Sequence, residues 1–169
     1  FLIIQGLDPS LSSYYSMGFD IAGLAGSVAT GYMLDKWFKG NWAALCLVLS
    51  LGVIGGYLAV MYLGASPIAI ALCFSIVGFM LYGPDILLSG AGPVETAGAR
   101  NGMVVAGIVN GLGSIGPIVQ EEVIGRLVRG DVQQGMANTN RLALGISVLL
   151  MLLFIPMVIR LQIARRKRS

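Results

Sequence analysis

The chain has 169 residues, of which 56% are hydrophobic and 11% are charged, and its formal net charge is +3. Ordinary soluble domains carry about 25% charged residues, and disordered chains combine low hydrophobicity with high net charge, so this composition excludes both classes. The mean hydropathy of +0.83 and the 24 glycines are typical of closely packed helices in lipid. We therefore predict an all-α, polytopic transmembrane helix bundle whose main partner is the lipid bilayer.

About five stretches are long and apolar enough to cross a bilayer, because a spanning helix needs about 20 mostly apolar residues. No charged residue occurs between Lys39 and Asp85, an interval long enough for about two crossings that turn at residues 64–67. The predicted spans cover residues 12–34, 42–63, 67–90, 101–125 and 140–161. Residues 1–5 show no signal-peptide pattern and are interpreted as the end of a further apolar helix, which makes the chain a fragment.

The basic residues of the loops predict an orientation. Residues 165–168 form a basic tail that is typical of the cytoplasmic surface of a membrane. The loops on the same side then hold Lys36, Lys39 and Arg100, and the opposite side holds Arg126, Arg129 and Arg141. The side with the tail is richer in Lys and Arg, in agreement with the positive-inside rule. No aromatic interleaving or RNA-binding motif accompanies the tail, so no nucleic-acid partner is expected.

The residue types that enzymes and metal sites need are sparse. The chain has no His, and Cys46 and Cys73 lie in apolar runs without CxxC spacing. The usual zinc ligand sets and the commonest general base are therefore absent. An intramembrane hydrolase would need a nucleophile–base pair, and Asp20 and Asp85 lie on different spans. We expect no enzyme activity, no catalytic residue, no metal and no cofactor.

Two carboxylates fall inside predicted spans, where a charge is costly unless it is paired or hydrated. Asp20 lies three residues before Gly23, so we expect it to be buried near that packing face, with a cationic partner from outside this chain. Asp85 follows Pro84, which removes a helical hydrogen bond and predicts a kink. It is either a residue at the cytoplasmic end of its span or, like Asp20, a substrate-binding or coupling residue.

Small and polar residues recur at four-residue spacing in the first and fourth spans. The small-residue stripes, which allow helices to approach closely, contain Gly23, Ser27 and Gly31 in the first span and Gly107 and Gly111 in the fourth. Asn110 and Ser114 also lie four residues apart and share a helix face. We interpret them as neutral hydrogen-bonding groups that line a central cavity, with helix packing as the alternative.

Polar residues gather at the far end of the fourth span, opposite the tail. Glu122 and Arg126 are spaced for an ion pair on a solvated helix end. Gln120 and Glu121 face either solvent or a vestibule, and the sequence alone leaves both positions open.

Residues 31–41 form a short charged loop between the first two spans. Asp35 stands at the C-terminal end of a helix, where a negative charge opposes the helix dipole. Lys36 and Lys39 are placed to meet anionic lipid headgroups, and Gly31 leaves space beneath the loop. We interpret these four residues as a gating loop in which Asp35 meets a helix N-terminus or a basic side chain elsewhere.

Several stretches resemble the major facilitator superfamily and, more narrowly, its organophosphate:phosphate antiporters. The segment Gly31-x-x-x-Asp35-Lys36-x-Phe38-Lys39-Gly40-Asn41 resembles the loop motif of the superfamily. Residues 78–84 (GFMLYGP) resemble the tenth helix of these antiporters, residues 110–116 (NGLGSIG) the eleventh, and Asp20 with Gly23 and Gly26 the eighth. Asp85 departs from the pattern, because that position is commonly uncharged in the bacterial members.

The resemblance implies a fold and a transport mechanism. Residues 1–169 would be a partial C-terminal six-helix half of a twelve-helix transporter, with a remnant of helix seven followed by helices eight to twelve. The protein would exchange a sugar phosphate or glycerol phosphate for inorganic phosphate by alternating access. The substrate-binding cations would lie outside this chain, whose partner would be the missing N-terminal half. The membrane would be a plasma (inner) membrane or an endoplasmic reticulum membrane, with the C-terminus cytoplasmic.

Two other membrane functions fit the same residues. In a proton-coupled symporter of another small solute, Asp20 or Asp85 would carry the proton. The second alternative is a non-transporting membrane sensor on the same fold.

Overall fold

The computed structural model describes residues 8–63, 66–129 and 131–166, and this part of the chain is helical almost throughout. The helices in chain order are α1 (Pro9–Lys36), α2 (Trp42–Leu63), α3 (Pro67–Ile86), the π-helical turn η1 (Leu87–Ala91), α4 (Gly92–Gly113), α5 (Ile115–Val128) and α6 (Val132–Arg166). The predicted helix-seven remnant at 1–5, the turn residues 64–65 and the tail residues 167–168 lie outside the described residues. The described ranges contain no strand, and the predicted all-α class is confirmed.

Four helical stretches are long and apolar enough to cross a membrane: Trp42–Leu63, Pro67–Gly98, Arg100–Val128 and Gln133–Ala164. The first of these coincides with the predicted span 42–63. Helix α1 is not among the four, because Asp20 and its small polar residues lower its hydropathy. Its 28 residues are nevertheless long enough to cross a bilayer. The predicted span 12–34 is thus confirmed as a helix, although its composition is less apolar than expected.

Two helices begin with the same local arrangement. The Asp8 carboxylate accepts a hydrogen bond from the Ser10 N–H at 2.9 Å, and the Ser66 hydroxyl oxygen accepts one from the Ala69 N–H at 3.2 Å. In both cases the capping residue is followed by proline, whose missing N–H is not needed in a first helical turn. These caps explain why α1 and α3 begin where they do.

The helix that begins as α3 runs further than predicted. It stays helical through Pro84, widens into the π-helical turn η1 and continues into α4 as far as Gly98, where φ is +75° and ψ is 162°. The widened turn lies immediately before Pro93, which lacks an N–H donor, and it allows the helix to continue. The predicted end at residue 90 is therefore wrong, and the direction of the chain changes at Gly98.

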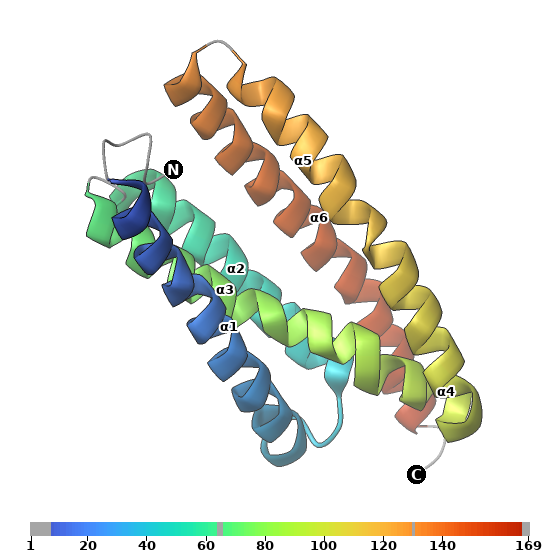
Figure 1. Cartoon of the computed structure of the whole chain (residues 1–169). Coiled ribbons are helices and arrows are strands. Elements are labelled where there is room, and N and C mark those ends of the chain that lie inside the picture. The colour runs from blue at the N-terminus through green and yellow to red at the C-terminus, as the bar shows by residue number, and fades with distance from the viewer. Residues whose placement is uncertain (1–7, 64–65, 130, 167–169) are drawn as a thin grey trace.

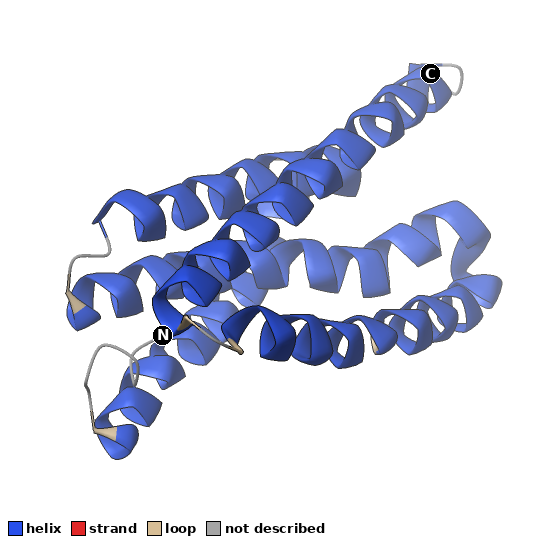
Figure 2. Ribbon diagram, turned by 90° about the horizontal axis from the view of Figure 1, so that it is seen from above, coloured by secondary structure: helices blue, strands red, loops and turns tan. Residues whose placement is uncertain are grey.

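The helices form two groups (Figures 1 and 2). Helix α3 packs against α1 and α2, and α6 packs against α2 and α5, while α4 contacts mainly η1. A buried cluster joins α2, η1 and α6; it contains Trp42, Ala43, Leu45, Cys46, Leu49, Leu87 and Phe154. This cluster is the main link between the two groups.

Glycines bring the parallel helices α1 and α3 into contact. A Cβ atom added to Gly26 would overlap the Phe79 carbonyl, and one added to Gly23 would overlap the Tyr82 ring. Together with Ser12 and Thr30, these two glycines form the buried face of α1. Of the predicted stripe of Gly23, Ser27 and Gly31, only Gly23 packs closely within the described bundle: Ser27 is half-buried and Gly31 faces open space. The packing role of Ser27 and Gly31 stays a prediction that needs a partner beyond the described residues.

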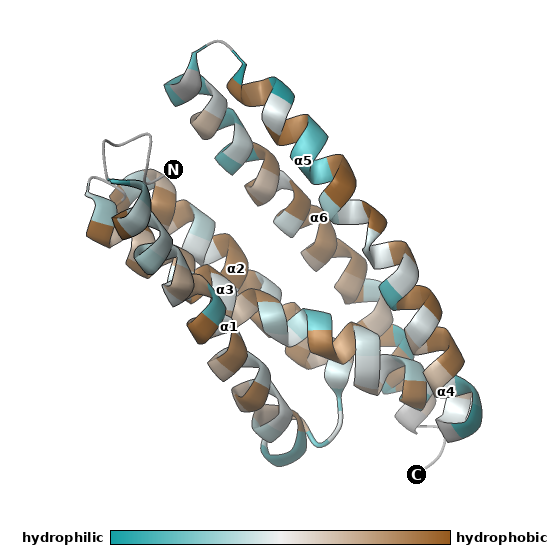
Figure 3. Ribbon diagram, in the orientation of Figure 1, coloured by the Kyte–Doolittle hydropathy of each residue, from teal (hydrophilic) through white to brown (hydrophobic). Residues whose placement is uncertain are grey.

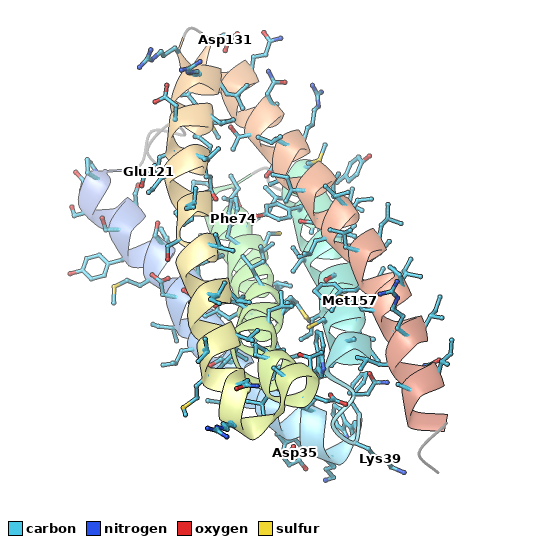
Figure 4. The ribbon with its side chains drawn as sticks, turned by 90° about the vertical axis from the view of Figure 1, so that its right-hand side faces the viewer. Asp35, Lys39, Phe74, Glu121, Asp131 and Met157 are labelled. Atoms are coloured by element: carbon cyan, nitrogen blue, oxygen red, sulfur yellow. The ribbon has the colours of Figure 1, made fainter. Side chains whose placement is uncertain are left out.

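The loops sort to the two ends of the bundle. The α1–α2 loop, the corner after η1 and the end of α6 lie at one end, and the α2–α3 and α5–α6 connections lie at the other (Figure 1). Figure 4 shows Asp35 and Lys39 at the first end and Asp131 at the second. The predicted grouping of the loops is therefore confirmed; which end is cytoplasmic stays a prediction.

The outer surface of the bundle is apolar. Large exposed side chains include Leu24 (68%), Val28 (72%) and Leu153 (57%). Figure 3 shows hydrophilic residues at helix ends and along α5, with hydrophobic colouring through the middle of α6. Such a surface belongs in lipid rather than in water, so the chain is an integral membrane protein.

Candidate functional site

Asp20 on α1 meets Tyr82 on α3. The Tyr82 hydroxyl donates a hydrogen bond to Asp20 Oδ1 at 3.3 Å, and Asp85 lies three residues after Tyr82 on the same helix. The Tyr82 ring packs edge to face on Phe19, with ring centroids 6.0 Å apart. The structure thus brings together Asp20 and Tyr82, which are far apart in the sequence, and we call Asp20, Tyr82 and the nearby Asp85 the acidic cluster.

Both carboxylates are exposed in the described part of the chain, so the burial of Asp20 stays a prediction that needs a partner beyond the described residues. Asp20 precedes Gly23 by three residues but Gly26 by six, which places it at the edge of the packing face rather than at its centre. No Lys or Arg of the described ranges forms an ion pair with either carboxylate.

A cavity of about 320 Å³ opens beside Asp20. Its walls are Tyr15, Ser16, Phe19 and Asp20 from α1 and Ile70, Ala71 and Phe74 from α3. Asp20 therefore faces a hydroxyl on one side and a cavity on another, so its surroundings are more polar than a lipid-facing position would be.

Tyr82 is the member of the acidic cluster that sequence reasoning missed. It lies 62 residues from Asp20, and only the parallel packing of α1 on α3 brings the two side chains together. The one available indication was its position in the segment 78–84, which also contains the glycine that contacts Phe19.

A larger cavity of about 860 Å³ separates the two helix groups. Helices α2, α3, α5 and α6 all contribute to its walls, which are mainly apolar. Gln120 is among the lining residues and Glu121 is not. We call this space the interhelical groove.

Asn110 and Ser114 line neither of these two cavities of the described bundle. Both are exposed, and the Ser114 hydroxyl donates to the Asn110 carbonyl at 2.8 Å at the junction of α4 and α5. A Cβ atom added to Gly107 or Gly111 would meet no described atom within 4 Å. The predicted cavity and packing roles of these residues therefore stay predictions that need a partner beyond the described residues.

The gating loop is a hydrogen-bonded turn. Lys39 and Gly40 have φ values of 49° and 76°, and the Gly40 N–H donates to the Leu34 carbonyl at 2.9 Å. Lys36 turns back to its own helix, with its ammonium 5.0 Å from the centre of the Tyr32 ring. Asp35 is exposed and forms no ion pair or hydrogen bond through its side chain with the described residues. Its carboxylate is thus available for a contact outside this bundle.

The predicted ion pair at the end of the fourth span is confirmed. Arg126 Nε donates to Glu122 Oε1 at 2.7 Å, and both side chains are exposed. Exposed pairs of this kind contribute only about 0.3–0.5 kcal/mol. The pair therefore contributes little to the stability of this helix end.

Three known proteins are similar to parts of the chain. It is 33% identical over 94 residues to the "Membrane sensor protein UhpC" of Escherichia coli and, over the same length, to that of Salmonella typhimurium. It is 27% identical over 116 residues to the "Glycerol-3-phosphate transporter" of Bacillus subtilis. Parts of the chain are therefore similar to a membrane sensor protein and to a transporter. No protein-family model and no solved structure matches it.

The similarity covers only part of each protein. The alignments include 51% of this chain for the sensors and 66% for the transporter. They include 21% and 25% of the relatives, so the chain spans about a quarter or less of the proteins it matches. None of the three is named as an enzyme, in line with the prediction that the chain is not one.

Proposed function

We propose that the chain is part of a secondary transporter of the major facilitator superfamily that exchanges a sugar phosphate or glycerol phosphate for inorganic phosphate. The similarity to the glycerol-3-phosphate transporter over 116 residues carries this proposal. In it, residues 1–169 belong to the C-terminal half of the protein, and the two halves rock about a central site. The membrane is a plasma (inner) or endoplasmic reticulum membrane, with the C-terminus cytoplasmic.

In this proposal the acidic cluster does not bind the phosphate group itself. A phosphate ester is bound by Arg or Lys, whereas two uncompensated carboxylates repel it. The described Lys and Arg residues lie toward helix ends or in loops, so the binding cations belong to the remaining helices. Asp20 and Asp85 then pair with those cations or with protons during the transport cycle, and Asn110 and Ser114 orient the uncharged part of the solute.

A membrane sensor is the second candidate function, and the two sensor matches at 33% identity favour it. A sensor on this fold binds the solute and changes shape without releasing it on the other side. The same acidic cluster and gating loop then respond to binding rather than drive exchange.

Counterflow in liposomes tests these functions. The full-length polypeptide is reconstituted, loaded with unlabelled phosphate or glycerol phosphate, and given labelled phosphate outside. Uptake that depends on the internal anion supports the antiporter. Saturable binding without uptake supports the sensor. Uptake that a proton gradient drives in the absence of internal anion supports the symporter and contradicts exchange.

A further inference from the structure

We propose that the cavity between α1 and α3 binds an organic ammonium group, with the Asp20 carboxylate as counter-ion and aromatic rings as walls. We call this space the Asp20 cavity. The inference adds a third partner for Asp20 to the cations and protons named above. It rests on the proposed function in one respect only: there the ammonium belongs to the transported phosphate ester, which is then zwitterionic.

The α1 side of the Asp20 cavity consists of two parallel rows. Tyr15 and Phe19, four residues apart, form an aromatic row, and Ser16 and Asp20 form a polar row beside it. Phe74 supplies a third ring from α3. Aromatic rings attract cations, and walls of such rings are the usual surroundings of bound quaternary ammonium groups. The cavity therefore combines one negative charge with the wall type that organic cations prefer.

The polar row offers acceptors and no donor. Asp20 Oδ1 accepts from the Tyr82 hydroxyl at 3.3 Å, and the Asp20 side chain forms no other hydrogen bond with the described residues. The Ser16 hydroxyl donates to the Ser12 carbonyl at 2.9 Å, so its oxygen is left to accept. An ammonium group has a positive charge, with donors in its primary form, and no acceptor, which matches this wall.

A second unmet polar group lies one turn from the polar row. Ser12 is 4% exposed, and its hydroxyl has no hydrogen-bond partner among the described residues. It shares a helix face with Tyr15 and Ser16, which follow it by three and four residues. The buried hydroxyl of Ser50, by contrast, donates to the Cys46 carbonyl at 2.8 Å. Because buried hydroxyls without partners are rare and costly, Ser12 independently indicates a polar ligand at this face of α1.

Close helix packing holds the walls of the Asp20 cavity in place. A Cβ atom added to Gly78 would lie 2.5 Å from the Phe19 carbonyl oxygen. Tyr57 on α2 packs edge to face on Phe74, with ring centroids 6.4 Å apart. The cavity volume of about 320 Å³ is at the lower end of the range of small-molecule pockets, about 300–1,000 Å³. This preformed space suits an ethanolamine or choline group rather than a whole sugar phosphate.

The residues of the Asp20 cavity disfavour other ligands. A phosphate group would meet the Asp20 charge without a cation from the described walls. Among the described residues, no group of three or more His, Cys, Asp or Glu is placed to hold a metal ion. Calcium and magnesium need about six or more oxygen ligands, whereas an organic ammonium needs one counter-charge and apolar walls.

Thermal unfolding of the full-length polypeptide with matched ligands tests the inference. Choline carries a quaternary ammonium, and dimethylbutanol is its uncharged analogue with carbon in place of nitrogen. In phosphatidylglycerol nanodiscs, we expect choline chloride to raise the unfolding midpoint by about 2 °C or more. Equal concentrations of dimethylbutanol or sodium chloride should leave it unchanged. No effect of choline, or an equal effect of either control, would overturn the proposal.

Two variants assign the effect to the Asp20 cavity. Asp20→Asn removes the counter-charge and should abolish the choline shift, whereas Glu122→Gln removes the same charge at an exposed helix end and should keep it. Tyr15→Leu removes one ring without changing the charge and should reduce the shift, which covers the case of an Asp20→Asn protein that does not fold. A full choline shift in Asp20→Asn or in Tyr15→Leu would overturn the proposal.

Two sources of the ammonium group, a solute and a lipid headgroup, are separated by further arms. A larger shift with phosphocholine than with choline or phosphate alone identifies a zwitterionic phosphate ester. Phosphatidylethanolamine nanodiscs that raise the midpoint and remove the choline effect identify the lipid headgroup. A choline shift in a protein that fails the counterflow assay keeps this inference and rejects only the proposed exchange. Counterflow without a choline shift does the reverse.

Discussion

Tyr82 links α1 to α3 through one hydroxyl group. Tyr82→Phe keeps the ring contacts with Gly23 and Phe19 but removes the donor to Asp20. Because a single hydrogen bond contributes about 1 kcal/mol, we expect only a small change in thermal stability. If the acidic cluster takes part in transport, the exchange rate falls severalfold. Tyr14→Phe is the control, since Tyr14 is 72% exposed. Equal exchange rates in the two variants would remove Tyr82 from the site.

Asp20→Asn tests the charge of the cluster. The amide keeps an acceptor for the Tyr82 hydroxyl, so insertion and folding are expected to stay normal. Without its negative charge, residue 20 can neither pair with a cation nor take up a proton. We expect exchange to fall by about tenfold or more, equivalent to about 1.4 kcal/mol in the barrier. Unchanged transport kinetics in liposomes would leave Asp20 with a packing role only.

At the scale of elements, the contact between α1 and α3 depends on glycine. In Gly26→Ala, the new methyl group overlaps the Phe79 carbonyl, a backbone atom that cannot turn aside. We expect a loss of about 1–3 kcal/mol, the usual cost of overpacking. Gly31→Ala is the matched control, because it faces open space on the same helix. It should be neutral or stabilise by about 0.5–1 kcal/mol. Thermal unfolding in detergent compares them, and similar losses in both would argue against close packing of α1 on α3 at Gly26.

Asp35 in the gating loop is expected to affect the balance between the two open states of the transporter. An anion near a helix N-terminus contributes about 0.3–1 kcal/mol, and up to about 2 kcal/mol when partly buried. If Asp35 makes such a contact in one open state, Asp35→Ala shifts the balance of the two open states severalfold. We expect altered turnover with little change in substrate affinity measured within one state. Normal turnover with weakened affinity would place the loop in the binding site instead.

Local sequence predicted some elements well and others poorly, for physical reasons. The bounds of α2 were predictable because an uncharged run starts after a charged loop and ends at a turn. The extension of α3 was not, because a π-helical turn accommodates Pro93 and only the positive φ of Gly98 stops the helix. The carboxylates were recognised as unusual within spans, but the Tyr82–Asp20 hydrogen bond arises from parallel packing of α1 on α3 that no spacing rule reveals.

At the scale of the whole molecule, Asp20 and Asp85 are exposed on the described bundle, and no described Lys or Arg pairs with them. We therefore expect the 169-residue chain alone to insert in membranes but neither to bind nor to exchange phosphate. Counterflow measured with this chain and with the full-length polypeptide checks the expectation. Exchange by the short chain would show that the remaining helices are dispensable and would contradict the proposed two-half mechanism.

The helix from Pro67 to Gly98 is longer than the hydrocarbon core of a bilayer is thick. Its 32 residues form a rod of about 48 Å, whereas the hydrocarbon core is about 30 Å thick. To fit within the core, the rod would have to lean by about 50°, beyond the usual range of 0–40°. One end therefore overhangs the membrane and carries the Gly98 corner into water, between Glu95 and Arg100. That corner is then open to cleavage by a protease added on one side of the membrane. The side from which the protease cleaves identifies the face on which the Gly98 corner lies.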